Sequence, residues 1–217
     1  MSSTSVELAT VAAFLRQHTH DLRNHLTGLD LEAAVLAETI TDAPSAEGVA
    51  RMQRQIRAVA LELKSLAEKF SAAETHRAPC AARELFLIWQ DQAAALGLDA
   101  IAWGSTLGDE KISVDVAAVS AVLEELLVNA RQFTGKAGLV AMADARHGEI
   151  AFELREAKIE PLDPTTWGER PFVSTKRGGY GLGLWQATRC VAASGGEIAR
   201  SYLPKGTLVT KVIFPLT

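Results

Sequence analysis

A histidine, an aspartate and an asparagine lie close together near the start of the chain. Asp21 directly follows His20, and Asn24 comes one helical turn after the histidine. A carboxylate that holds one ring N–H of an imidazole leaves the lone pair of the other nitrogen free to attack phosphorus. An amide one turn away can orient a water or a phosphoryl oxygen. The spacing therefore predicts a nucleophilic His20, although most exposed helical histidines have no chemical role.

The helix that must carry His20 has a heptad pattern. With leucines at the seam positions, His20 falls near the opposite, solvent-facing side, whereas His18 and His25 fall close to the seam and are expected to be structural. The leucines recur every seventh residue at Leu8, Leu15, Leu22, Leu29 and Leu36.

A second heptad helix follows a turn at residues 41–45. Its apolar residues alternate in steps of three and four, which is typical of a coiled-coil seam. They are Val49, Met52, Ile56, Val59, Leu63, Leu66 and Phe70. Two such helices form an antiparallel hairpin, and a second copy would complete a four-helix bundle. The alternative is that the hairpin packs on the rest of its own chain.

The remainder of the chain mixes helices with strands. After a linker at residues 71–79 we expect helices at 80–97, 116–133 and 181–194, with Asp115 as the N-cap of the second and Gly195-Gly196 ending the third. The expected strands are residues 98–103, 111–114, 139–143, 149–154, 201–203 and 208–214, with a hairpin turn at His147-Gly148. This order indicates an α+β unit with a largely antiparallel sheet.

Composition restricts the class of protein. The formal net charge is -4, which gives no reason to expect nucleic acid as a partner. No stretch approaches the roughly 20 apolar residues of a membrane span, and the N-terminus lacks the pattern of a signal peptide. Two distant cysteines, Cys80 and Cys190, favour a reduced, cytoplasmic compartment.

Two segments of the second unit have residues suited to nucleotide binding. Glu125 and Asn129 lie one turn apart on a predicted helix, where a carboxylate and an amide oxygen can hold Mg²⁺. The alternative is two ordinary polar residues. A glycine-rich loop with Lys176, Gly179, Gly181 and Gly183 precedes a helix, an arrangement that lets backbone N–H groups approach phosphates.

The order of these motifs resembles the catalytic core of sensor histidine kinases. The motifs are HDLRN, ELLVNARQFT, RPFVSTK, GGYGLGLWQATRCVAASGGEI and KGTLVTKVIFPL. The resemblance covers nearly the whole chain. It implies a dimerisation and histidine-phosphotransfer hairpin at residues 1–74, followed at residues 80–217 by an α/β sandwich of the Bergerat ATPase type.

The resemblance also implies roles for individual residues. His20 would be the phosphorylated residue, Asp21 its acid/base neighbour and Asn24 the residue that assists dephosphorylation. Asn129 would be the magnesium ligand with Glu125 as its partner. The three glycines, together with Lys176, would contact ATP.

One family motif is absent. In this family an Asp in a DxGxG motif binds the adenine amino group, but the matching residues 152–161 contain neither Asp nor Gly. Either Arg155 or Glu156 takes the Asp position; a guanidinium has no acceptor atom, and Glu is one methylene longer than Asp. We therefore expect binding of ATP with Mg²⁺ to be weak or absent.

Three functions remain open at this stage. The chain is a phosphotransfer protein exchanging a phosphoryl group between His20 and a response-regulator receiver domain, or a minimal histidine kinase that uses ATP and takes its input from a separate sensor. The third is a dimeric scaffold for such partners without chemistry. Under each of the three functions we expect a homodimer and partners from two-component signalling.

Overall fold

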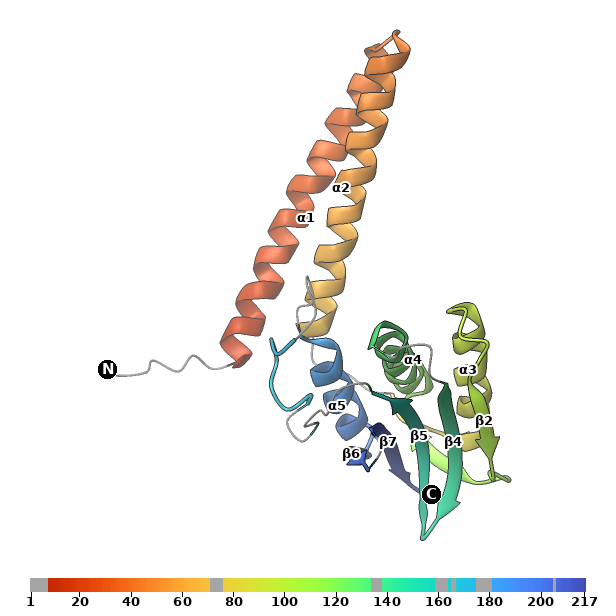
Figure 1. Ribbon diagram of the computed structural model, residues 1–217. Coiled ribbons are helices and arrows are strands. Elements are labelled where there is room, and N and C mark those ends of the chain that lie inside the picture. The colour runs from red at the N-terminus through yellow and green to blue at the C-terminus, as the bar shows by residue number, and fades with distance from the viewer. Residues whose placement is uncertain are drawn as a thin grey trace. The chain divides into compact units, whose positions relative to one another are not determined.

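The computed structural model describes residues 8–70, 76–133, 138–158, 164, 167–174, 181–204 and 206–217. The chain divides into two compact units, Met1–Ala72 and Ala73–Thr217. The first is a pair of long helices and the second combines helices with strands (Figure 1). Within the described residues, no helix is both long and apolar enough to cross a membrane.

The first unit is the predicted helical hairpin. Helix α1 spans Leu8–Thr39 and α2 spans Ala43–Phe70. The turn is shorter than the predicted 41–45, because Asp42 caps α2: its carboxylate accepts a hydrogen bond from the Ser45 N–H at 2.9 Å. Pro44 then lies in the first turn of α2, where a missing N–H leaves no bond unmade.

Small residues form the contact between the two helices. Ala12, Thr19 and Ala33 of α1 are buried, and Val49 of α2 is buried with them. The Thr19 hydroxyl donates to the Leu15 and Arg16 carbonyls at 2.8 and 3.0 Å, so its polar atom is satisfied inside the hairpin.

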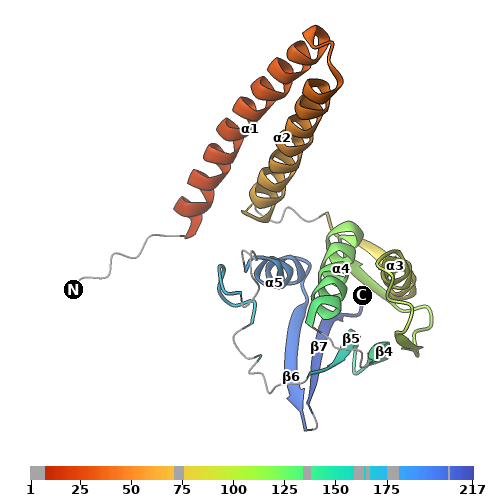
Figure 2. The ribbon, with the colours of Figure 1, turned by 45° about the horizontal axis from the view of Figure 1, so that its top comes forward.

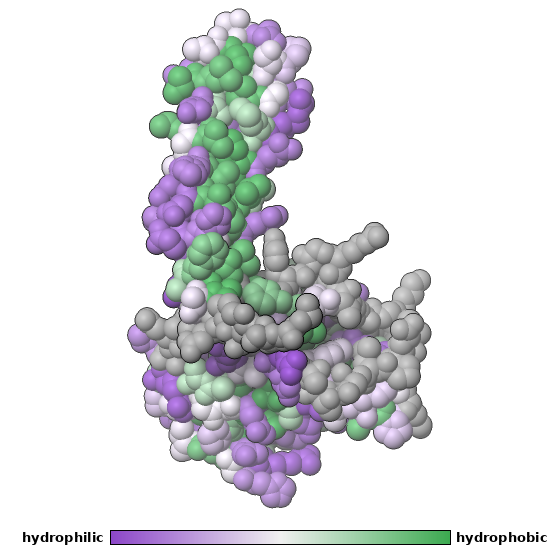
Figure 3. Space-filling view, turned by 90° about the vertical axis from the view of Figure 1, so that its left-hand side faces the viewer, coloured by the Kyte–Doolittle hydropathy of each residue, from purple (hydrophilic) through white to green (hydrophobic). Residues whose placement is uncertain are grey.

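Three of the heptad leucines lie beside this contact rather than within it. Leu22, Leu29 and Leu36 remain 36%, 49% and 47% exposed in the single chain. Met52 and Val59 of α2 are exposed to a similar degree. A hydrophobic band runs along the hairpin in the space-filling view (Figure 3). The seam expected from the leucine repeat is therefore open in one copy of the chain.

The second unit is built on one five-stranded sheet in the order β2-β4-β5-β7-β6. The strands are β2 Ala102–Ser105, β4 Leu139–Arg146, β5 Glu149–Ala157, β6 Glu197–Leu203 and β7 Thr207–Pro215. The β2–β4 pair is parallel and the other pairs are antiparallel. The α+β class is thereby confirmed.

Three helices cover one face of this sheet (Figure 2). They are α3 Ala82–Ala95, α4 Val116–Phe133 and α5 Gly183–Ala193. Alternate residues of β5, namely Ile150, Phe152 and Leu154, are fully buried under them. The indole N–H of the buried Trp89 donates to the Leu123 carbonyl at 3.1 Å, which joins α3 to α4.

A two-stranded sheet at the start of this unit was not predicted. Strand β1, Ala78–Ala81, pairs antiparallel with β3, Lys111–Val114. The prediction of a linker at residues 78–79 and of a helix that begins at Cys80 is wrong, because β1 covers these residues and α3 begins at Ala82. Strand β2 is also displaced from the predicted 98–103, because the α3 helix closes through Gly97, whose φ is +69°, and residues 98–101 form the following turn and loop.

The predicted N-cap of α4 is confirmed. Asp115 Oδ1 accepts the Ala118 N–H at 3.0 Å, and its Oδ2 accepts the His76 N–H at 3.0 Å. These backbone hydrogen bonds lower the pKa of Asp115. Arg77 Nε donates to the Ser113 carbonyl at 3.0 Å. The first described residues of this unit are thus tied to the start of α4.

Candidate functional site

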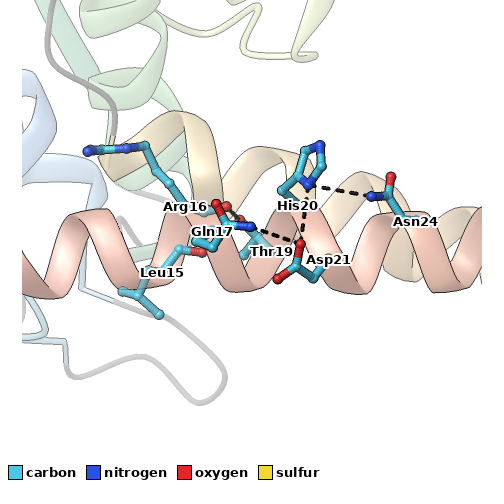
Figure 4. A network of polar contacts seen from close by, with 7 residues as sticks. All are labelled: Leu15, Arg16, Gln17, Thr19, His20, Asp21 and Asn24. Atoms are coloured by element: carbon cyan, nitrogen blue, oxygen red, sulfur yellow. Dashed lines mark hydrogen bonds and ion pairs between the residues drawn. The ribbon is translucent and has the colours of Figure 1, made fainter.

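His20 projects from α1 into solvent. Its side chain is 61% exposed, in agreement with the heptad argument. Asp21 and Asn24 lie beside it on the same helix (Figure 4). His18 and His25, expected near the seam, are also exposed in the single chain, and the His18 ring stacks on Phe14 with centroids 5.6 Å apart.

Both neighbours of His20 contact the same ring nitrogen. Nδ1 lies 3.3 Å from Asp21 Oδ1 and 3.4 Å from Asn24 Nδ2. An ionised carboxylate requires a proton on Nδ1, whereas an amide N–H requires a lone pair there. With the proton on Nδ1, Nε2 has the free lone pair, and Nε2 has no hydrogen-bond partner within the described part of the chain. The three predicted residues are therefore together, with one ring nitrogen open to solvent.

A fourth residue of this cluster was missed by the sequence analysis. Gln17 Nε2 donates to Asp21 Oδ1 at 3.0 Å. The hydrogen bond from Gln17, followed by that from His20, lowers the pKa of Asp21. The signal was present in the sequence, because Gln17 stands one helical turn before Asp21.

The second predicted cluster lies where α4 meets the start of α5. Asn129 Nδ2 donates to Glu125 Oε1 at 3.0 Å. A Cβ added at Gly183 would lie 2.0 Å from that same carboxylate oxygen, so the carboxylate occupies the space that any other residue at position 183 would need. Three of the predicted residues are thus brought together.

The rest of the glycine-rich loop is only partly described. Gly181 has a φ of +64°, and a Cβ there would lie 2.5 Å from the Val173 backbone, so glycine is required on both counts. Lys176 and Gly179 lie outside the described residues.

Of the two residues expected at the place of the absent Asp, Glu156 lies in a buried ion pair. Glu156 shares the helix-facing side of β5 with Leu154, whereas Arg155 lies on the other face against Glu153. Lys158 Nζ donates to Glu156 Oε2 at 2.6 Å, and the two side chains are only 6% and 7% exposed. The Lys158 N–H also donates to the Gly206 carbonyl at 2.7 Å.

These residues fit ATP with Mg²⁺ only in part. Asn129 and Glu125 supply an amide and a carboxylate of the kind that Mg²⁺ accepts, the other ligands then being water and phosphate. On the base side, one oxygen of the Glu156 carboxylate already accepts a bond from Lys158, and Glu is one methylene longer than the Asp of the family motif. Among the described residues, no three His, Cys, Asp or Glu side chains form a metal-ligand cluster.

Comparison with known proteins identifies the fold. No protein-family model and no curated protein matches the sequence. Full-length ShkA, solved in complex with AMPPNP, aligns over 94% of this chain with a TM-score of 0.72 and 22% identity, and the chain spans 46% of ShkA. The Acinetobacter baumannii histidine kinase AdeS aligns over 91% of this chain and 98% of its own, with a TM-score of 0.58 and 14% identity.

The second unit by itself also has counterparts. The catalytic domain of histidine kinase ThkA aligns over 64% of this chain and 95% of its own, with a TM-score of 0.55 and 17% identity. At these identities the likeness concerns the fold. This chain therefore has the fold of a histidine kinase catalytic core, a helical hairpin followed by a unit of the histidine kinase ATPase type.

Proposed function

We propose that this protein is a histidine phosphotransferase of a two-component pathway, which carries a phosphoryl group on His20 and exchanges it with the Asp of a receiver domain. The observation that carries the proposal is the exposure of the His20 ring together with the contact of its Nδ1 atom with Asp21. Its side chain is 61% exposed, and Asp21 lies on Nδ1 while Nε2 faces solvent. A nucleophile so placed can reach a phosphoryl group held by another protein.

The transfer needs nothing beyond the two proteins and the receiver's own ions. The Nε2 lone pair attacks phosphorus, an N–P bond forms, and the P–O bond of the receiver's aspartyl phosphate breaks, its electron pair returning to the carboxylate. Asp21 stabilises the proton on Nδ1 as positive charge develops on the ring. In the reverse step a receiver carboxylate attacks phosphorus, and Nε2 recovers its lone pair.

The buried pair of Glu156 and Lys158 supports a role without ATP. An adenine amino group would have to share the Glu156 carboxylate with Lys158, whose ammonium group already donates to Oε2 at 2.6 Å. Separating the two groups would leave a buried charge unpaired, which is costly. The second unit then serves as a structural and docking module, and the phosphoryl group comes from a receiver charged by a separate sensor kinase.

The exposed band of the hairpin supports a homodimer. Leu22, Leu29 and Leu36 of α1 fall on one side of the helix, because a repeat of seven residues returns close to the same face. Met52 and Val59 repeat in the same way on α2. A second hairpin placed on this band would bury both rows and complete a four-helix bundle.

Two labelling reactions on purified protein test the proposed function. The first supplies γ-labelled ATP with Mg²⁺, and the second supplies receiver domains charged with labelled phosphate by acetyl phosphate. We expect no label from ATP and label on His20 from at least one receiver. The label should vanish in His20→Ala and persist in His25→Ala, a matched exposed histidine on the same helix.

The other two functions give different results. Label on His20 from ATP would establish the kinase, which the Glu125–Asn129 pair beside Gly183 favours. No label from either source, with signalling unchanged in His20→Ala, would establish the scaffold. A thermal-shift titration with ATP adds an independent measure, and we expect no shift.

A further inference from the structure

We infer that Gln17 is a positioning residue, which aims the Asp21 carboxylate at His20 and so sets the ring tautomer in which Nε2 is the nucleophile. The inference rests on the proposed function for its consequence, but the tautomer is a property of the unphosphorylated protein. The observation is that one carboxylate oxygen, Asp21 Oδ1, receives both the Gln17 amide at 3.0 Å and the His20 ring at 3.3 Å (Figure 4).

The contacts of the ring define a choice between two states. If Nδ1 carries the proton, it donates to Asp21, and Nε2 can attack phosphorus. If Nδ1 has the lone pair, Asn24 Nδ2 donates to it at 3.4 Å, and the proton on Nε2 prevents attack. Asp21 and Asn24 therefore compete for Nδ1, and each favours a different tautomer. In water a histidine side chain on its own prefers the proton on Nε2, so the reactive tautomer needs support.

Gln17 supplies that support by holding Asp21. The Asp21 side chain is 52% exposed, and a carboxylate in this situation samples several rotamers. Because an ionised carboxylate only accepts hydrogen bonds, the amide of Gln17 must donate, which fixes its orientation. The bond spans one helical turn and holds Oδ1 on the side of the helix where His20 stands.

The orientation of Asp21 also determines what Asn24 can do. While Asp21 accepts the hydrogen bond from Nδ1–H, the Asn24 amide has no acceptor on the ring. It is then available to a phosphoryl oxygen or a water. Loss of Gln17 would release Asp21 and let Asn24 occupy Nδ1. One side chain outside the HDLRN motif thus determines the roles of two residues within it.

Long-range ¹⁵N–¹H NMR on histidine-labelled protein tests the inference directly. The measurement is made at about pH 9, well above the ordinary histidine range, so that the neutral tautomers are compared. In the parent protein we expect an excess of the Nδ1–H form at His20. In Gln17→Glu, which keeps the shape but cannot donate, the ratio of Nδ1–H to Nε2–H should fall roughly two- to tenfold, as for loss of one hydrogen bond.

Two further variants separate positioning from a structural role. Gln17→Lys keeps a donor one turn before Asp21 and should retain the parent ratio. Gln55→Glu makes the same charge change on an exposed site of α2 and should also leave the ratio unchanged. Equal ratios in Gln17→Glu and the parent protein would overturn the inference, as would equal shifts in Gln17→Glu and Gln55→Glu.

Reaction with phosphoramidate links the tautomer to phosphorylation. Nε2 attacks phosphorus, an N–P bond forms, and the P–N bond of the reagent breaks with release of ammonia. We expect His20 to be labelled at Nε2, more slowly in Gln17→Glu in proportion to the fraction of the ring in the Nδ1–H form. If the ratio shifts but receivers never label His20, the positioning role stands and the proposed function fails. If receivers label His20 but the ratio does not shift, the proposed function stands and the positioning role of Gln17 fails.

Discussion

Asp21 and Glu156 are carboxylates that each accept a hydrogen bond from a residue close in sequence. Gln17 holds Asp21 at the surface, where the carboxylate can also accept from His20. Lys158 holds Glu156 in the interior, where an ion pair is costly to separate. The first arrangement leaves a carboxylate exposed beside His20, and the second places one in a buried ion pair.

The burial of Glu156 makes a testable prediction about stability. Lys158→Met leaves the carboxylate buried without its cation and should lower the free energy of unfolding by about 3–5 kcal/mol. Replacing both partners, as Lys158→Met with Glu156→Leu, should recover most of this loss. Urea unfolding followed by circular dichroism measures both.

A second ion pair on the same sheet provides the control. Lys211 pairs with Glu153 at 2.9 Å but is 43% exposed, and Arg155 contacts the same carboxylate. Lys211→Met should therefore cost only about 1 kcal/mol or less. Equal losses in the free energy of unfolding for Lys158→Met and Lys211→Met would mean that the buried pair contributes no more to stability than the exposed one.

At the scale of elements, Asp115 joins the start of α4 to the segment that precedes β1. Asp115 accepts from Ala118 within the helix and from His76 ahead of β1. These backbone hydrogen bonds lower the pKa of the folded carboxyl below its unfolded value of about 3.9. Its contribution to stability is therefore complete above that value and is lost as the pH falls through the lower, folded pKa.

Substitutions at this cap should depend on pH in a defined way. At pH 7, Asp115→Ala should cost about 1 kcal/mol, the usual effect of losing an N-cap. The difference from the parent protein should shrink as the pH falls below about 3.9. Asn also caps helices and does not titrate, so Asp115→Asn should hold a nearly constant stability contribution across that range. Chemical denaturation at a series of pH values checks this, and a cost for Asp115→Ala that is independent of pH would contradict it.

The sequence predicts helices of this chain better than its short strands. The bounds of α4 match the prediction, because Asp115 marks its start. Strand β1 was missed because Ala78–Ala81 has no alternation of its own and is held only by β3, which lies far along the chain. Local patterns report local structure, whereas this strand depends on a distant partner.

The site residues also differ in whether local sequence patterns or contacts between elements position them. Glu125 and Asn129, one helical turn apart, are in contact as the spacing suggested, whereas Gln17 and Asp21, also one turn apart, were not grouped. The sequence left Arg155 and Glu156 as alternatives, and the alternation of β5 with the buried Leu154 places Glu156 on the helix-facing side. The pair with Lys158 escaped prediction, because burial at the end of a strand depends on the elements packed over it.

At the scale of the whole molecule, the open seam of the hairpin predicts the assembly state. The parent protein should behave in sedimentation or light scattering as a particle of twice the 23.2 kDa chain mass. Leu22→Glu with Leu29→Glu should give a monomer, because each leucine buried at an interface contributes about 1.5–3 kcal/mol and each substitution occurs twice in a symmetric dimer.

The control for the assembly prediction uses a leucine outside the seam. Leu61 is 67% exposed and falls on the side of α2 opposite Ile56 and Leu63 by helical spacing. Leu61→Glu should leave the dimer intact. A monomeric parent protein, or dissociation by Leu61→Glu alone, would contradict a bundle formed through the leucine repeat.

The attachment of the chain at the start of the second unit has a mechanical consequence. His76 is bonded to the α4 cap, Arg77 to β3, and β1 then runs along β3. A load applied to the chain at His76 would therefore act on these hydrogen bonds before it reached the five-stranded sheet. The first element to feel that load is α4, the helix that carries Glu125 and Asn129. Asp115 therefore anchors the start of the second unit as well as capping α4, and a load applied there would pass through its two hydrogen bonds.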